Sequence, residues 1–361
     1  MPAMGKLATW AANVSTTWGT AGTIAAATNG FYPKTIDPVV LKGEPNIDDA
    51  SGMLGRTNYQ RTQDIADPSI TLAMRWNGHL EFLIMARWMG DDTVTGPSSN
   101  LYTHTMNYNE VNILTGGIGI VGRLDSSSAN SIMEIPTMKV PSFVMQPADG
   151  FWDLSTNQTI GNSVYVAGDG KITADNTAVG NVTYRTSGQR MKFKANPWRM
   201  NAQSGDALDA DDAVLDVANM SISFEDSYHD MRDVLLDSTT PNENAEPIPT
   251  GEGKRIMVSY EQKIYDYATH RNVLNAGTEW KADLVQTETI GGDAYSFTMQ
   301  FGRLISIDPQ VVSERGLMMP MTHNYEAIDP ASAPTGMAAA TPVHIILANL
   351  LSRTYETNAA P

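Results

Sequence analysis

Residues 68–90 decide the fold, and they read PSITLAMRWNGHLEFLIMARWMG. In the first part of this stretch apolar side chains alternate with polar or small ones, the pattern of a β-strand with one buried face. The alternating apolar residues are Ile70, Leu72, Met74 and Trp76. In the second part the apolar residues fall at helical spacing, at Leu80, Leu83, Ile84 and Trp88. The stretch therefore predicts a strand, a tight corner and a short helix.

The ends of the predicted helix carry their own signals. Asn77 is a residue type that caps helix N-termini, and Glu81 falls in the first turn, where a negative charge is favourable. Arg87 falls in the last turn, and Gly90 can adopt the left-handed conformation that ends a helix. The sequence thus predicts a helix between Asn77 and Gly90.

A second, weaker version of this unit lies near residues 255–277. Ile256, Val258 and Tyr260 alternate along a predicted strand, Asp266 is a candidate cap, and a short helix would end at Gly277. The two versions are offset by about 185 to 190 residues, which indicates a duplicated unit. The alternative is coincidence, because a strand followed by a helix is a common arrangement.

Composition sets the limits on class. The 361 residues are 42% hydrophobic and 18% charged, which predicts a globular chain long enough for two domains. The absence of cysteine excludes disulfides, thiol catalysis and zinc–thiolate sites. The net charge of −16 is expected to repel nucleic acid phosphates. Neither a signal peptide nor a membrane-spanning segment is expected.

Along the chain the patterns predict a mainly β architecture with little helix. Long polar connections are expected at Lys42–Asp67 and Glu225–Gly253, and a hairpin is expected around Gly291–Asp293. Ile132–Gln146 carries two prolines, with Pro147 directly after it, which favours edges or bends over a central strand. Thr341–Tyr355 is compatible with either a helix or a final buried strand.

The domain boundary is expected in the turn-rich segment 168–180. Residues 1–170 would form an N-terminal β domain with an N-terminal arm. Residues 171–361 would form a C-terminal β domain that ends in a strand or tail.

The candidate chemical motifs do not predict an active site. Residues 117–122 match the G-x-G-x-x-G nucleotide fingerprint, but no helical pattern follows them, so a glycine-rich strand or loop is expected. An acidic cluster lacks the register of an EF-hand and is interpreted as a solvated loop, with incidental calcium binding as the alternative. Its members are Asp206, Asp209, Asp211, Asp212 and Asp216. The six histidines lack metal-ligand spacing, so we expect no catalytic, cofactor or metal site and no enzyme.

Three short stretches resemble the tail tube (major tail) proteins of long, non-contractile-tailed bacteriophages. One is the opening Thr17-Trp18-Gly19-Thr20, and another is the strand-to-helix unit that ends in Arg87-Trp88-Met89-Gly90. The third runs from Phe301 through Ile307-Asp308-Pro309 to Tyr325-Glu326-Ala327-Ile328 and resembles the closing strands of that family.

The resemblance implies a tail-tube-type β-sandwich or barrel with short flanking helices, here as two tandem tube-like domains. It also implies a long loop that reaches the next ring, and strands that continue between neighbouring subunits into a closed inner barrel. The rings would be trimers with pseudo-sixfold symmetry or hexamers, stacked into a tube through which DNA passes without specific binding. The partners would be further copies of the chain and the tape measure, tail terminator and distal tail proteins. The location would be the virion tail, assembled in the host cytoplasm.

Two other classes remain open at this stage. One is a different virion surface protein, such as a capsid decoration protein or an adhesin. The other is a β-sandwich glycan-binding protein or glycosidase, in which exposed tryptophans would stack on sugars. The candidate tryptophans for such stacking are Trp10, Trp152, Trp198 and Trp280.

Overall fold

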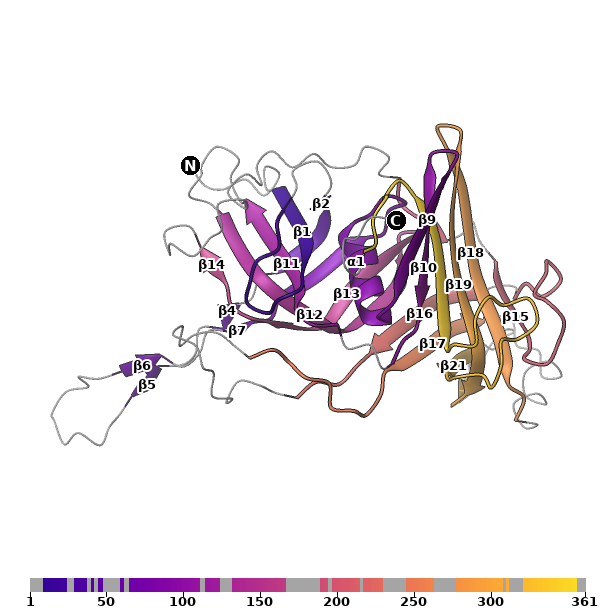
Figure 1. The fold of residues 1–361 in the computed structure, drawn as a ribbon. Coiled ribbons are helices and arrows are strands. Elements are labelled where there is room, and N and C mark those ends of the chain that lie inside the picture. The colour runs from indigo at the N-terminus through magenta and orange to yellow at the C-terminus, as the bar shows by residue number, and fades with distance from the viewer. Residues whose placement is uncertain are drawn as a thin grey trace.

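The chain is mainly β, with a sandwich-like fold and a single α-helix in the part that the structure describes (Figure 1). A computed structural model describes residues 9–24, 29–37, 40–41, 45–47, 59–61, 65–110, 114–123, 132–166, 189–193, 197–214, 217–229, 245–262, 277–307, 310–311 and 321–355. The mainly β fold class predicted from the sequence is confirmed.

The elements of the N-terminal half are β1 (Thr9–Ser15), β2 (Gly30–Phe31), β3 (Pro33–Asp37), β4 (Val40–Leu41), β5 (Pro45–Ile47), β6 (Tyr59–Arg61), β7 (Ile65–Ala66), β8 (Ser69–Ala73), α1 (Leu80–Met89), β9 (Asp92–Ser98), β10 (Leu101–Asn107), β11 (Gly117–Arg123), β12 (Ile132–Ala148), β13 (Phe151–Gly161) and β14 (Tyr165–Val166). Those of the C-terminal half are β15 (Trp198–Ala202), β16 (Val217–Glu225), β17 (Arg255–Gln262), β18 (Trp280–Ile290), β19 (Asp293–Ser306), β20 (Gln310–Val311), β21 (Met321–Ala327) and β22 (Val343–Asn349).

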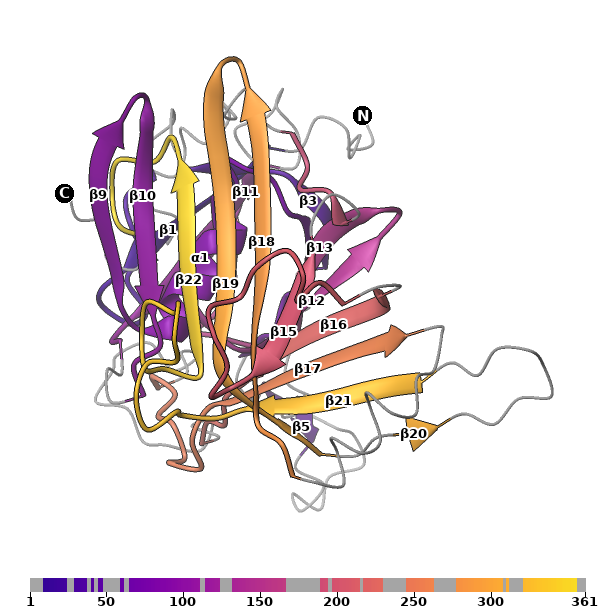
Figure 2. The same cartoon turned by 90° about the vertical axis from the view of Figure 1, so that its right-hand side faces the viewer.

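Twenty of these strands form one continuous antiparallel network, and β5 and β6 form a separate two-stranded sheet. The β5–β6 hairpin projects from the body of the molecule (Figure 1). Figure 2 shows two layers: β9, β10, β22, β19 and β18 stand side by side, and β12, β16, β17 and β21 cross them at a steep angle. Among the described residues the network is not closed into a barrel.

The same strand order occurs twice in this network. In the first half the hydrogen-bonded order is β1-β11-β12-β13-β8-β3. In the second half it is β15-β18-β19-β21-β17-β16. If the six strands of each half are numbered by their order in the chain, the spatial order in both halves is first, fourth, fifth, sixth, third, second. We call these two sets of strands the first and second units. An identical order of six strands is strong support for an internal duplication.

The fifth strand of each unit turns the same corner. In the first unit Met138 of β12 pairs with Ile118 of β11 on one edge and with Gly161 of β13 on the other. In the second unit Leu304 of β19 pairs with Trp280 of β18 and with Ala327 of β21. The first part of each long strand therefore belongs to one layer and its last part to the other, so a single strand connects the two layers of each unit.

The two units are joined directly by strand pairing. Phe143, Val144 and Met145 of β12 pair antiparallel with β16 on the edge that β11 has left. The result is one eight-stranded sheet across both units, in the order β3-β8-β13-β12-β16-β17-β21-β19. The predicted boundary between residues 170 and 171 lies outside the described residues and stays a prediction.

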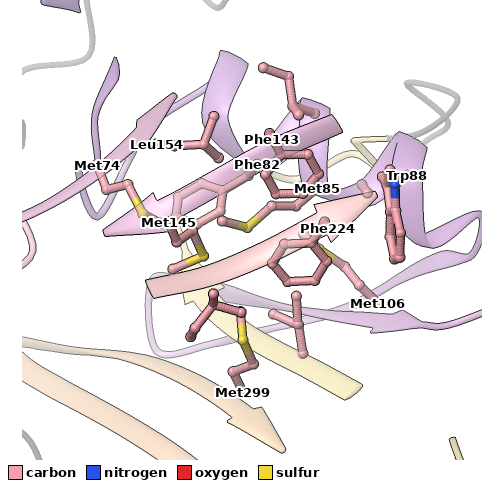
Figure 3. Close-up of a cluster of buried hydrophobic side chains, with 14 of the residues drawn as sticks. Met74, Phe82, Met85, Trp88, Met106, Phe143, Met145, Leu154, Phe224 and Met299 are labelled. Carbon is pink, nitrogen blue, oxygen red and sulfur yellow. The ribbon is translucent and has the colours of Figure 1, made fainter. Parts of the chain in front are cut away.

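The core lies between the two layers, with α1 in its centre. Nine of the ten helix residues are buried, because apolar side chains surround the helix on all sides. Phe82 packs on Phe297 of β19, and Trp88 packs on Phe143 and Phe224 at the junction of the units. Methionines fill the remaining space around these rings (Figure 3). The helix therefore does not lie on the outside of the sheets, as a flanking helix would.

Several local predictions are confirmed and others are wrong. Gly90 ends α1 in the left-handed conformation, and Gly291–Gly292 forms the β18–β19 turn. The N-cap is His79, without a side-chain cap, and not Asn77, whose side chain instead accepts from the Leu350 amide and donates to the Tyr295 hydroxyl.

The proline-rich stretch is also different from the prediction. β12 is a central strand that pairs on both edges, and Pro141 lies where its register with β13 shifts. The Pro141 carbonyl accepts from the Asp226 amide and the Trp88 indole. The missing proline N–H is tolerated because it falls at an irregular position of the sheet.

The described residues nearest to each end of the chain include a strand of the network. Within the predicted N-terminal arm, residues 9–15 form β1, which pairs with β11 along its whole length. Of the two readings of residues 341–355, the strand is correct, as β22. The predicted second helix near Tyr267 and Leu274 lies outside the described residues.

Candidate functional surface

The glycine motif at residues 117–122 serves packing. All six residues lie in β11, and the glycines stand where another chain segment approaches closely. A Cβ on Gly117 would lie 2.5 Å from the Met138 carbonyl oxygen, and one on Gly122 would lie 2.4 Å from the Trp10 ring. The expectation of a glycine-rich strand is confirmed.

Carboxylates of the acidic cluster accept hydrogen bonds from backbone amides of their own loop. Asp212 accepts from the Asp209 amide and Asp209 accepts from the Asp211 amide, so these carboxylates hold turns in the loop. Asp216 lies outside the described residues. Within the described part of the chain, no three His, Asp or Glu side chains are grouped so that they could hold a metal ion.

Three of the four tryptophans proposed for sugar stacking are in the core. Trp10, Trp152 and Trp198 are buried, and Trp280 is partly buried and packs against the core. A sugar ring cannot reach a buried indole face. These three indoles are therefore not available for stacking on a sugar, and Trp280 is the one of the four that stays partly exposed.

The outward face of the eight-stranded sheet is the most regular surface of the molecule. One face of these strands is apolar and buried against α1 and the second layer. On the other face a continuous row of paired residues crosses all eight strands, four in each unit. In spatial order the row is Thr35, Thr71, Ser155, Val144, Ser223, Met257, Glu326 and Ile305.

Side chains on this face are apolar, small, or polar with a neighbouring partner, and the larger apolar members of the row are Val144, Met257 and Ile305. Ser259 donates to Asn324 at 2.8 Å, and Thr71 lies 3.1 Å from the Ser155 hydroxyl. The charged Arg255 is paired with Glu326 at 2.9 Å. The face therefore offers few unpaired donors or charges to a passing polyanion.

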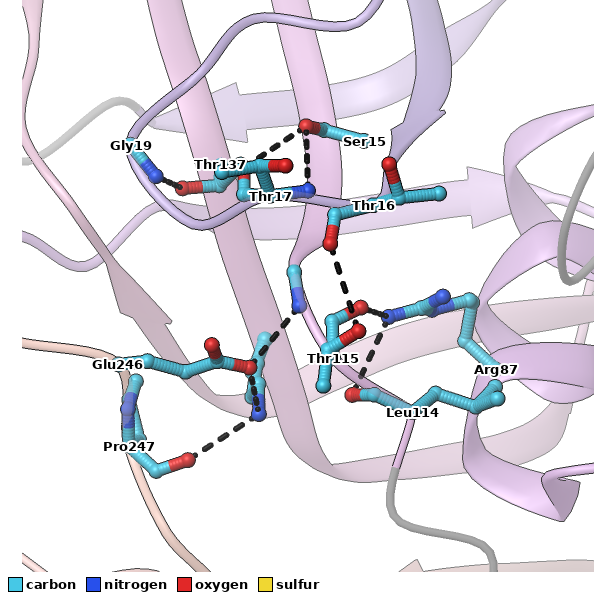
Figure 4. A network of polar contacts seen from close by, with 12 residues as sticks. Ser15, Thr16, Thr17, Gly19, Arg87, Leu114, Thr115, Thr137, Glu246 and Pro247 are labelled. Carbon is cyan, nitrogen blue, oxygen red and sulfur yellow. Dashed lines mark hydrogen bonds and ion pairs between the residues drawn. The ribbon is translucent and has the colours of Figure 1, made fainter.

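Polar contacts fix the seam between the two units (Figure 4). Lys139 of β12 forms an ion pair with Glu246 at 2.8 Å and donates to the Pro247 carbonyl at 3.1 Å. Glu246 also accepts from the Gly116 amide, and Arg87 at the end of α1 donates to the Thr115 carbonyl. The second long polar connection is thus tied to the helix and to β12.

The opening turn joins the same region. Ser15 donates to the Thr17 carbonyl at 2.9 Å, and the Gly19 amide donates to the Thr137 hydroxyl at 2.8 Å (Figure 4). Gly19 has a φ of 76°, which favours glycine. This stretch, which carried part of the resemblance, therefore has a structural role against β12.

A cavity of about 180 Å³ lies along the seam beside Trp88. Its lining carries three cations, Arg87, Lys139 and Lys254, and two acids, Glu110 and Asp226. Lys139 is in addition paired with Glu246. Burial lowers the pKa of both lysines and raises the pKa of Asp226. The opposite charges of Lys254 and Asp226 counteract the effect of burial on each other's pKa, as expected of a buried polar seam.

The described residues include no helix that is long and apolar enough to cross a membrane. In comparisons with known proteins, no family model matches the chain, and no curated protein matches it significantly.

Proposed function

We propose that the chain is a structural virion protein that assembles into rings, which stack to form the tail tube of a long, non-contractile-tailed bacteriophage. The observation that carries the proposal is the eight-stranded sheet built from two units with the same strand order. A repeated unit whose open sheet already continues from one copy into the next is the arrangement that a closed ring requires.

The two-unit chain favours a trimer. Three copies would supply six similar units and a pseudo-sixfold ring, whereas six copies would supply twelve. Ring closure would also cover the strand edges that a single chain leaves unpaired. The β5–β6 hairpin projects from the body and falls within Lys42–Asp67, one of the two long polar connections that are candidates for the inter-ring loop.

The outward face of the eight-stranded sheet would line the lumen. Its small or apolar side chains and paired charges, in a chain with a net charge of −16, would let DNA pass without binding. Tape measure, tail terminator and distal tail proteins would be further partners in a virion tail assembled in the host cytoplasm.

Negative-stain electron microscopy of the purified chain tests this function. Stacked hollow rings with threefold or pseudo-sixfold modulation are the expected result. If the subunits associate but form only discrete particles without a lumen, the result would favour a decoration protein or an adhesin.

Adding positive charge to the lumen face should create DNA binding. For the double variant Ser223→Lys/Ser259→Lys, we expect assembled tubes to bind short duplex DNA about tenfold or more tightly than wild type at low salt. The gain should fall steeply as salt rises, because bound phosphates release counterions. Fluorescence anisotropy measures both effects.

The matched control carries two new lysines on the other layer, Thr93→Lys/Thr95→Lys, at exposed positions of β9. It should leave DNA binding close to wild type. Equal gains in both variants would show that net charge alone is responsible, and would contradict the assignment of the lumen face.

A further inference from the structure

The junction inside the chain provides a template for a junction between chains. Phe143, Val144 and Met145 of β12 pair antiparallel with Phe224, Ser223 and Ile222 of β16. The Asp226 amide extends the contact by donating to the Pro141 carbonyl at 3.0 Å. At this junction the fifth strand of one unit meets the second strand of the next.

The eight-stranded sheet ends in the two strands that correspond to this pair. At its start lies β3, which is the second strand of the first unit and corresponds to β16. At its other end lies β19, which is the fifth strand of the second unit and corresponds to β12. β20 follows β19 in the chain. Among the described residues, β3 pairs only with β8, and β20 pairs only with β21.

The free edge at the second end begins where β18 stops. β18 pairs with β19 as far as Leu304, and no named strand covers that edge from Ile305 onward in the described part of the chain. The segment nevertheless keeps its place beside β21, because the Ile307 amide donates to the Asn324 carbonyl at 3.0 Å and Gln310 pairs with Thr322. At Ile305–Ile307 and at β20, the side that faces away from β21 has no strand pairing within the described residues.

Exposed apolar side chains mark both ends independently. The described part of the chain has five large hydrophobic side chains that are exposed, and three of them lie at these ends. Tyr32, next to β3, is 49% exposed, and Ile305 and Ile307 are 37% and 44% exposed. Apolar side chains gathered at an unpaired edge are typical of a surface that a partner covers.

We propose that the β3 edge of one copy pairs antiparallel with the edge formed by Ile305–Ile307 and β20 of a second copy, repeating the β12–β16 junction. The contact is head-to-tail, because the two edges are different, so it leaves a free edge at each end until a ring closes. The inference names the self-contact on which the proposed tube would be built, but the strand pairing can be tested without observing tubes.

The chain contains no cysteine, so engineered cysteines report the pairing without background. One set of variants carries a single cysteine at every second residue from Pro33 to Leu41, and another set carries one at every second residue from Ile305 to Val311. Pairs of variants are mixed, oxidised and separated on a non-reducing gel, and mass spectrometry identifies the linked residues. The expected result is cross-linked dimers between the two sets. Because the pairing is antiparallel, cysteines at higher residue numbers in one set should link to cysteines at lower residue numbers in the other.

Two controls calibrate the scan. Val144→Cys/Ser223→Cys in one chain places both thiols at the internal junction, where they should form a disulfide within the chain. Ser259→Cys lies on the same face but in β17, between two paired strands, and should not cross-link to either edge.

The outcomes separate this inference from the proposed function. Rings in the microscope without cross-links between the sets would overturn the edge pairing and leave the tube intact. Cross-links between the sets without rings would support the pairing and count against the tube. Links only within one set would show a symmetric dimer and contradict the head-to-tail contact, as would a complete absence of links in concentrated protein.

Discussion

Replacing Glu81 by glutamine is expected to raise the stability of the subunit above neutral pH by about 3 kcal/mol. Glu81 is buried in the first turn of α1, where its carboxylate accepts a hydrogen bond from the Arg75 amide at 3.2 Å. Burial raises its pKa from 4.5 to about 7, and backbone hydrogen bonds and the charge of Arg75 oppose this only in part. Between about pH 4.5 and 7 the Glu81 carboxyl is therefore largely protonated in the folded chain and largely ionised in the unfolded chain.

The sign of the pH dependence follows from this difference. Between pH 4.5 and 7 the folded state binds more protons at Glu81 than the unfolded state, so this residue lowers the free energy of unfolding as pH rises. Above about pH 7 its contribution becomes constant. Glu81→Gln should abolish that slope, because an amide does not titrate in this range.

Urea unfolding of wild type and variant at several pH values measures the effect. The control is Glu326→Gln, whose carboxylate is partly exposed and paired with Arg255. It should change stability little at any pH. An identical slope in wild type and Glu81→Gln would show that Glu81 is ionised in the folded chain and would contradict the prediction.

Replacing Phe224 by alanine should lower the free energy of unfolding by about 3–5 kcal/mol. Phe224 is 1% exposed and stacks on Phe143 with ring centres 4.6 Å apart, and Trp88 packs on it edge-on at 5.1 Å. These three rings hold together β12, β16 and α1 (Figure 3). The variant leaves a cavity where the two units meet, and aromatic contacts are lost as well.

Chemical denaturation checks the size of this loss. Ser223→Ala is the matched control, because it alters the neighbouring residue of the same strand on the outward face and should remain within about 0.5 kcal/mol of wild type. A loss of similar size in both variants would indicate that the strand, and not the ring cluster, supports the junction.

Short-range patterns predicted the strands and the helix well. Alternating apolar residues identified β8 and β17, and helical spacing identified α1, because burial of one face leaves its period in the sequence. The N-cap was wrong for a different reason. The Asn77 side chain is held by Tyr295 and by the Leu350 amide, which are far away in the sequence, and these contacts override its local preference.

The candidate surface was less accessible to sequence reasoning. The residues of the outward face are serines, threonines, paired charges and single apolar side chains such as Val144 and Met257, so no motif marks them. The repeated strand order depends on which strands pair, and pairing is set by contacts between residues far apart in the chain. In the sequence, the duplication was indicated only by two similar strand patterns, one around Ile70 and one around Ile256, and by the offset between them.

The two corner-turning strands also have a mechanical consequence. β12 and β19 run from one layer into the other, so the layers of each unit are connected by covalent backbone as well as by side-chain packing. Sliding one layer over the other would require stretching or breaking these strands. A tube built from such subunits would therefore bend by tilting whole rings against each other, and the wall of each ring would behave as a stiff band.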